Sequence, residues 1–289
     1  MIHLENNHVS ITVNPKGAEL QSIYCKDTAL EYLWSGDAAF WGKKSPVLFP
    51  IVGGLKNNTY KHNGTAYQLG RHGFARDMEF TLTAKEKDSI SFTLNTNDNT
   101  LQQYPFLFHF VITYSLHKNV LTCTYQVTNV DIQPLFFSVG AHPAFKVPLV
   151  EGTSFEDYYL LFNAKESAGK WPLTPDGLID TKPVPFFNNN NRIELNKPLF
   201  YGDALVFKGL QSTSIALQSN QTKHGFTFSY SNFPFMGIWS AKNADFVCIE
   251  PWCGIADSVD ANGELRKKEG IHLLTPGEVM SRSWSVTLY

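Results

Sequence analysis

The sequence has few charged residues and few cysteines. Lys and Arg number 24 and Asp and Glu number 26, which gives a net charge of −2, and charged residues make up 17% of the chain, whereas soluble domains average about 25%. A nearly neutral chain offers no field for nucleic acid or an anionic membrane, so we expect neither partner. Four cysteines are too few for a disulfide scaffold, and the nearest two, Cys248 and Cys253, lack CxxC spacing.

Several recurrent patterns are also missing. No apolar run approaches the roughly 18 residues of a membrane helix, and residues 1–14 alternate polar and apolar side chains, unlike a signal peptide. We therefore expect a cytoplasmic protein. The lack of GxGxxG, P-loop and GxSxG motifs argues against a nucleotide cofactor and a serine nucleophile. His72 and His142 are potential metal ligands, but no HxH or HExxH spacing accompanies them, so we predict no metal and no cofactor.

What the sequence has in quantity is aromatic residues and strand patterns. Phe, Tyr and Trp make up 14% of the chain, and hydrophobic residues 43%. Most segments alternate with the two-residue period of strands, and the only helical turn expected is at residues 38–41. We predict an all-β fold, a large antiparallel β-sandwich with more than a dozen strands in a single domain, residues 1–289. Residues 164–196, which are rich in Pro and Asn, are predicted to form a surface loop.

Three segments place ionisable residues where strands are expected to end, next to glycine or proline. Taken singly, each such residue is more often exposed or simply hydrogen-bonded. Their coincidence predicts a site, because functional groups of β-proteins concentrate on loops held by a rigid scaffold. The segments are GRHGFARD at 70–77 with His72, SVGAHPAF at 138–145 with His142, and VCIEPW at 247–252 with Glu250.

Five segments in order carry a family resemblance: SPVLFPIVG at 45–53, HGFARD at 72–77, GAHPAF at 140–145, IEPW at 249–252 and PGE at 276–278. With these segments the chain resembles the galactose mutarotase-like superfamily, the aldose 1-epimerases, and most closely its LacX-like branch. The resemblance spans nearly the whole chain. It implies a β-supersandwich in one domain and interconversion of the α and β anomers of an aldose without a cofactor.

The resemblance implies that Glu250 is the general base and His142 the general acid. Opening a hemiacetal requires removal of the C1 hydroxyl proton and protonation of the ring oxygen, which a carboxylate and a protonated imidazole on opposite sides of that bond can perform. The C1–C2 bond then rotates, and the ring closes on the other face. The pKa of histidine already lies near neutral pH, so His142 is expected to need little adjustment of its pKa. Partial burial beside Trp252 is expected to raise the basicity of Glu250.

Four further residues are implied or expected as substrate contacts. His72 is expected near the ring oxygen and hydroxyls, and Asp203, in a YGDA segment, is expected to hold ring hydroxyls. Arg76 is a further contact, and Trp252 offers a flat apolar surface for a pyranose. Other aromatic residues near the motifs share this potential, although core packing is their more common role. They are Trp34, Trp41, Phe74 and Phe145.

The sequence departs from the family pattern at two positions. The LacX-like branch often has a substrate-binding arginine after the Val-Gly pair, where this chain has Gly54. Either Lys56 or Arg76 takes its place, or the specificity differs. Trp252 is followed by Cys253, where an aromatic residue is common, and this predicts a smaller pocket wall.

Two alternatives to an epimerase of free hexoses remain open. A hexose-6-phosphate 1-epimerase needs cations that converge on the phosphate. A sugar-binding or regulatory protein of the same fold needs no acid–base pair, so the presence of His142 and Glu250 argues against it. In every case the predicted partner is a small-molecule sugar, and the chain is predicted to act as a monomer or homodimer. The candidate cations for binding the phosphate in the first alternative are Arg71, Arg76, Lys56 and Lys146.

Overall fold

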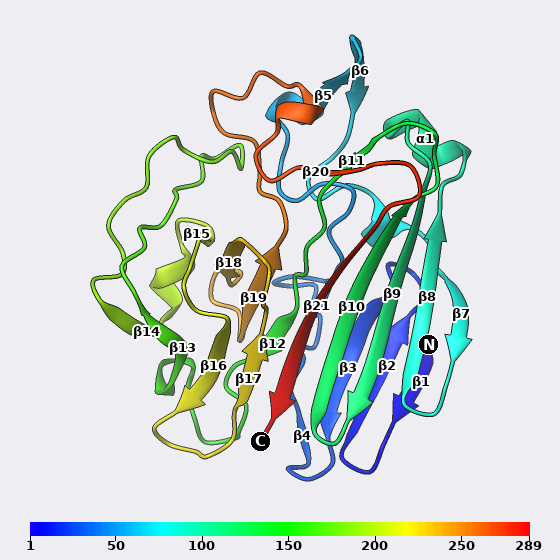
Figure 1. The fold of residues 1–289 in the computed structure, drawn as a ribbon. Coiled ribbons are helices and arrows are strands. Elements are labelled where there is room, and N and C mark those ends of the chain that lie inside the picture. The colour runs from blue at the N-terminus through cyan, green and yellow to red at the C-terminus, as the bar shows by residue number, and fades with distance from the viewer.

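The computed structural model describes all 289 residues, and strands dominate it (Figure 1). Neighbouring strands of its largest sheet are all antiparallel, which confirms the predicted all-β fold. The nine strands of this sheet follow the order β14 (Asn190–Glu194), β13 (Tyr158–Glu166), β16 (Ser214–Ser219), β17 (Phe226–Ser229), β21 (Val279–Leu288), β10 (Val120–Asn129), β9 (Phe108–His117), β8 (Ser89–Asn95) and β7 (Thr81–Lys85).

Two four-stranded sheets pack against one face of the large sheet. The strand register puts Tyr114 and Phe226 on that face. The Tyr114 hydroxyl donates a hydrogen bond to the Ala18 carbonyl at 2.8 Å, and the ring of Phe226 packs on Phe145 with 4.2 Å between centroids. The core therefore lies between the large sheet and these two. They are ordered β1 (Ile2–Glu5), β2 (Val9–Asn14), β3 (Glu19–Cys25), β4 (Leu30–Glu31), and β12 (Ala144–Lys146), β19 (Phe246–Trp252), β18 (Phe235–Trp239), β15 (Leu205–Lys208).

Short elements connect these layers. Two strand pairs form small ribbons, β5 (Thr59–His62) with β6 (Thr65–Gln68) and β11 (Leu135–Phe137) with β20 (His272–Leu274). The one α-helix, α1 (Asp98–Gln103), begins with a capping box on Asn97, and no helix in the chain could span a bilayer. The 3₁₀ helices are η1 (Lys56–Asn58), η2 (Ala75–Asp77), η3 (Phe155–Asp157), η4 (Lys197–Phe200) and η5 (Leu265–Lys267).

Strand β19 differs from the strands of the large sheet. Alternate residues of β9 are buried, as expected when one face of a strand meets the core, but all seven residues of β19 are buried. The prediction that Glu250 ends a strand is therefore wrong, because β19 continues through Pro251 to Trp252. Glu250 lies inside a central strand, paired with Gly237 of β18, and is only 2% exposed.

Of two smaller predictions, one needs correction and the other is confirmed. Residues 164–196 are not simply a surface loop: β13 extends into them, β14 lies within them, and Ile179 and Phe187 are buried. Their apolar side chains are spaced too irregularly to show strand or helix periodicity, so the sequence did not reveal this burial. At residues 38–41 the predicted helical turn is present, because the amides of Phe40 and Trp41 both bond to the Asp37 carbonyl.

Candidate active site

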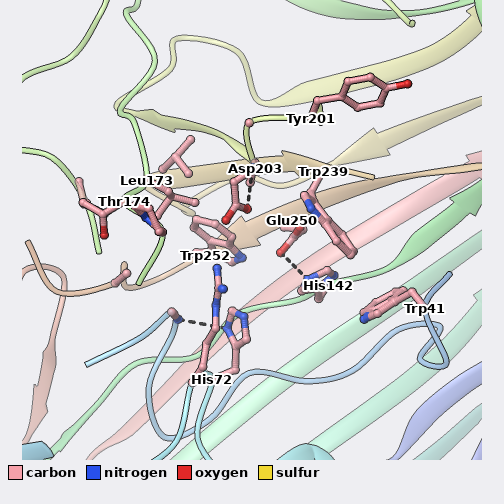
Figure 2. A pocket seen from close by; sticks show the side chains of 18 of the residues that line it. Trp41, His72, His142, Leu173, Thr174, Tyr201, Asp203, Trp239, Glu250 and Trp252 are labelled. Atoms are coloured by element: carbon pink, nitrogen blue, oxygen red, sulfur yellow. Dashed lines mark hydrogen bonds and ion pairs between the residues drawn. The ribbon is translucent and has the colours of Figure 1, made fainter. Parts of the chain in front are cut away.

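A pocket of about 690 Å³ opens beside the middle of β19 (Figure 2). All six residues predicted for the site line it, although they come from four separate parts of the chain. Its volume falls in the usual range for small-molecule sites, roughly 300–1,000 Å³. The lining residues of the predicted site are His72, Arg76, His142, Asp203, Glu250 and Trp252.

Glu250 and His142 are in direct contact. Nε2 of His142 lies 3.2 Å from Oε2 of Glu250, and the two side chains are 11% and 2% exposed. The backbone sets this contact, because the Ala141 amide bonds to the Pro251 carbonyl and Ala144 pairs with Cys248. The expectation that the two groups stand on opposite sides of the reacting bond does not fit this contact.

Burial favours the uncharged forms of both side chains. It raises the pKa of Glu250 well above that of a free carboxyl and lowers the pKa of His142. The two groups therefore share one proton and titrate as a pair. The expectation that His142 needs little tuning is wrong, because a buried imidazole beside the positive charges of Arg76 and Arg71 resists protonation.

His72 lies edge-on to His142, with 5.8 Å between the ring centroids. Its backbone is left-handed, with φ of +68°, and its Nδ1 accepts a hydrogen bond from the Gly53 amide at 3.1 Å. An accepting Nδ1 places the proton of the neutral ring on Nε2. Burial holds the pKa of His72 well below its usual range, so this side chain is a neutral hydrogen-bond donor in the pocket.

Asp203 and two arginines add charge to the pocket. Asp203 follows η4 with φ of +83°, and its Oδ1 accepts from the Ala204 amide, which leaves the second oxygen without a protein donor. Arg76 donates to the Arg71 carbonyl and lies 3.7 Å from Asp77. Arg71 has no acidic partner, and its guanidinium lies beside Gly177, where a Cβ would be 3.2 Å from Nη1.

The structure shows which of the four candidate cations lie at the pocket. Arg71 and Arg76 line the pocket, whereas Lys56 and Lys146 do not. Lys56 instead donates to the Val259 carbonyl, and Lys146 is exposed at the end of β12. The cations at the pocket are therefore the two arginines of the 70–77 segment.

Trp252 forms part of the pocket floor because two glycines make room for its indole. A Cβ at Gly237 would lie 2.4 Å from the Trp252 ring, and one at Gly140 would lie 2.8 Å from it. The indole Nε1 is buried without a hydrogen-bond partner. The ring is thus fixed by packing on neighbouring strands, and it lines the pocket as apolar surface.

Trp41 lines the pocket, as a sugar contact would require, and it also packs against His142. Its ring stacks on His142 with 4.9 Å between centroids, and Trp239 meets the same imidazole edge-on at 5.7 Å. Nδ1 of His142 is buried without a hydrogen bond, so packing orients the ring in place of a second-nitrogen contact. Trp34, Phe74 and Phe145 do not line the pocket and belong to the core.

The structure adds wall residues that sequence reasoning missed. Leu173, Thr174 and Ile179 come from the segment predicted to be a surface loop, and Tyr201 and Ala256 complete the rim. The amide of Ile179 bonds to the Asp257 carbonyl, which holds this segment against residues 255–257. No sequence motif marks these positions, because they contribute apolar surface rather than chemistry.

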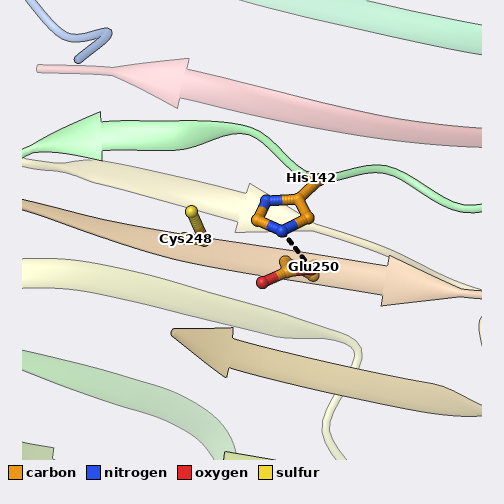
Figure 3. A group of neighbouring side chains, drawn as sticks. All are labelled: His142, Cys248 and Glu250. Atoms are coloured by element: carbon orange, nitrogen blue, oxygen red, sulfur yellow. Dashed lines mark ion pairs between the residues drawn. The ribbon is translucent and has the colours of Figure 1, made fainter. Parts of the chain in front are cut away.

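One set of side chains in the site has the composition of a metal centre. Ligand atoms of His142, Cys248 and Glu250 lie within 4.8 Å of one another (Figure 3). Cys248 and Glu250 are two residues apart on β19 and so project to the same side of the strand. No CxxC or HxH spacing marks this group in the sequence, because His142 comes from the segment between β11 and β12, more than 100 residues before β19.

Comparison with known proteins identifies the family of the chain. A model of the family described as aldose 1-epimerase matches residues 1–278. The chain is 33% identical over 99% of both lengths to the chromosomal protein LacX of Lactococcus lactis subsp. lactis.

Solved structures agree as well. The galactose mutarotase related enzyme from Lactobacillus acidophilus superposes with a TM-score of 0.94 at 36% identity, covering 100% of this chain and 97% of that one. A galactose mutarotase-like protein from Lactobacillus casei superposes with a TM-score of 0.92 at 31% identity over the full length of both. The chain therefore belongs to the aldose 1-epimerase family, is related to LacX, and has the galactose mutarotase-like fold.

Proposed function

We propose that this protein is an aldose 1-epimerase that interconverts the α and β anomers of a free hexose. The observation that carries the proposal is the buried contact between Glu250 and His142 at the wall of the pocket. A carboxyl and an imidazole that share one proton supply the base and the acid that ring opening requires. The family supports the reaction class, and the pocket supports a small polar substrate.

The contact between the two groups suits the atoms that react. O1 and O5 of an aldopyranose are bonded to the same carbon, so a base and an acid that are neighbours can reach both from one side. In the form with ionised Glu250 and protonated His142, the carboxylate removes the O1 proton while the imidazolium protonates O5. The C1–O5 bond breaks, and the pair again holds one proton. Rotation about C1–C2 and the reverse transfers close the ring as the other anomer.

The other residues would bind and orient the sugar. His72 presents a neutral N–H donor beside His142, and Asp203 presents a carboxylate oxygen for two ring hydroxyls. Trp252 offers an apolar face, and Arg76 contributes a cation at the edge of the pocket. This combination of apolar wall and few polar groups is typical of sites for neutral sugars.

One observation favours a second substrate class. Arg71 and Arg76 both line the pocket, and Arg71 has no carboxylate partner in the protein. A phosphoryl group on C6 would accept hydrogen bonds from such a pair. We therefore keep hexose 6-phosphates as the alternative substrates, with the arginines in place of the lysines first considered.

The test is a mutarotation assay with the purified chain over a panel of free and 6-phosphorylated aldoses. We expect acceleration of the approach to anomeric equilibrium for at least one free hexose. Arg71→Met should then change kcat/KM for free hexoses by only a few-fold. Preference for the phosphorylated sugars, abolished by Arg71→Met, would support the alternative. Sugar binding by calorimetry without acceleration of any sugar would instead make this a binding protein and refute the proposal.

Other aspects of the protein stay predictions. They are its organisation as one domain over residues 1–289, its cytoplasmic location, and its action as a monomer or homodimer with a sugar as partner. Size-exclusion chromatography with light scattering, with and without substrate, measures the oligomeric state directly.

A further inference from the structure

The side chains of His142, Cys248 and Glu250 form a compact group that the proposed reaction uses only in part. Their ligand atoms lie within 4.8 Å of one another, and Figure 3 shows the thiol and the carboxylate on the same side of β19 with the imidazole beside them. Cys248 is fully buried and does not line the pocket, whereas the other two do. The thiol therefore lies one layer behind the acid–base pair and has no role in the proton transfers.

The donor set is that of a transition-metal site. Thiolate, imidazole and carboxylate all bind zinc, and three protein ligands with one open position are typical of accessible zinc sites. Ligand atoms around such an ion lie about 3.3–3.8 Å apart, so the group must contract by about 1 Å. The contraction requires only side-chain rotation, because all three residues already face one another.

One further observation and one charge argument point to a metal ligand. Nδ1 of His142 is buried without a hydrogen-bond partner, and the whole residue is only 8% exposed, so the ring has unused bonding capacity inside the group. A divalent ion with one thiolate, one carboxylate and a neutral imidazole also has no net charge, which suits a buried position. The pocket supplies the open side, where water completes the coordination.

We propose that His142, Cys248 and Glu250 bind a divalent zinc ion, and that the bound ion inhibits the enzyme. On binding, the thiol proton and the proton shared by the acid–base pair leave to solvent, and metal bonds take their place. Glu250 and His142 then lack the lone pair and the proton that ring opening needs. Metal binding stands on the geometry alone, whereas inhibition rests on the proposed function.

Cobalt(II), which replaces zinc in such sites, is the probe for binding. The full chain titrated with cobalt should develop a near-ultraviolet thiolate-to-cobalt charge-transfer band that saturates at one ion per chain and disappears on addition of zinc. Cys248→Ser should lose the band, and Cys253→Ser, which alters another buried cysteine on the same segment, should keep it. Absence of the band in the wild-type chain, or its persistence in Cys248→Ser, would overturn the proposal.

Mutarotation assays test the inhibition. We expect stoichiometric zinc to reduce the wild-type rate at least about tenfold, a chelator to restore it, and Cys248→Ser to need at least about tenfold more zinc with an unchanged metal-free rate. A cobalt band with zinc-insensitive mutarotation would refute inhibition while leaving the site. A cobalt band in a chain with no mutarotase activity would refute the proposed function and leave the metal site standing.

Discussion

Two buried acid–base pairs lie on β19 and the segment that follows it, and they differ in how completely they are bonded. Asp257 accepts hydrogen bonds from Lys268 Nζ at 2.9 Å and from the Lys56 amide at 3.0 Å, and Lys268 also donates to the Ile255 carbonyl. Glu250 has the 3.2 Å contact with His142, whose second nitrogen has no partner, and its one further polar neighbour is the buried indole N–H of Trp252, which makes no well-aligned hydrogen bond.

The difference separates a structural pair from a reactive one. The bonds of Asp257 and Lys268 are satisfied by the protein, and the pair fixes residues 255–257, including the pocket residue Ala256. Glu250 and His142 keep hydrogen-bonding groups without protein partners at the pocket wall, where a substrate can bond to them. Burial without full hydrogen bonding costs stability, and such groups concentrate where function requires them.

The largest expected effect is a loss of stability when the fully hydrogen-bonded pair of Asp257 and Lys268 is broken. Lys268→Met leaves Asp257 buried and ionised without its cation, and we expect the free energy of unfolding to fall by about 3–5 kcal/mol. Lys208→Met, which breaks an ion pair with the exposed Glu269, is the control and should cost less than about 1 kcal/mol. Denaturant unfolding measures both. Equal losses in the two variants would contradict the distinction between the pairs.

The next largest effect is a loss of activity when the pair of Glu250 and His142 is altered. His142→Asn should reduce kcat by about 10²–10⁴-fold, because the acid that protonates O5 is removed. Adding Glu250→Gln to this variant should reduce kcat little further, since residues that act as a unit give non-additive losses. Polarimetry on the single and double variants measures the coupling. Losses that multiply would show that the two groups act independently.

The pH dependence of stability follows from the raised pKa of Glu250. The folded chain holds a proton that the unfolded chain releases above the ordinary carboxyl pKa of 4.5, so stability is lost as pH rises from there through the folded-state pKa. Glu250→Gln removes this loss. Its free energy of unfolding relative to wild type should therefore increase as pH rises from 4 to 8, by at most about 1.4 kcal/mol per pH unit, which denaturant unfolding at each pH measures. A constant difference across this range would contradict a raised pKa of Glu250 in the folded chain.

A smaller effect is expected at His72. Asn tolerates the left-handed backbone of this position but lacks the ring nitrogen that donates into the pocket. Loss of one neutral hydrogen bond predicts that His72→Asn lowers kcat/KM by about tenfold, with KM raised as well as kcat lowered. Steady-state kinetics separate the two parameters, and an unchanged KM would argue against a substrate contact.

The smallest effect is expected at Trp41. Trp41→Phe keeps an aromatic face against His142 and should lower kcat by only a few-fold. Trp41→Ala leaves the His142 imidazole free to rotate and should lower kcat further. Because the residue acts through His142, the pH profile of kcat should shift in the alanine variant. A loss in kcat with no shift in the profile would indicate a general packing defect.

The sequence predicted those parts of the molecule that depend on local patterns. The hairpin of β9 and β10 shows clear two-residue alternation because one face of each strand is buried, and this period is the signal that predicted an all-β fold. The motifs likewise led to His72, His142 and Glu250, since catalytic residue types next to glycine and proline are unusual. The structure brings these residues together in one pocket.

The sequence failed where only the three-dimensional arrangement carries information. β19 is buried on both faces, so its apolar run hid the position of Glu250 inside a strand. The choice of Arg71 over Lys56, the stacking of Trp41 on His142 and the thiol of Cys248 behind it all depend on convergence of distant segments. Spacing along one chain contains no signal for such contacts.

The central claim is that the under-bonded pair of Glu250 and His142 performs the chemistry, and the comparison of two glutamate variants tests it most directly. Glu166 is as buried as Glu250 but accepts backbone hydrogen bonds far from the pocket. With equal concentrations of folded protein, polarimetry should show Glu250→Gln at least about 10²-fold slower than wild type and Glu166→Gln within a few-fold of it. Mutarotation that survives in Glu250→Gln would contradict the account.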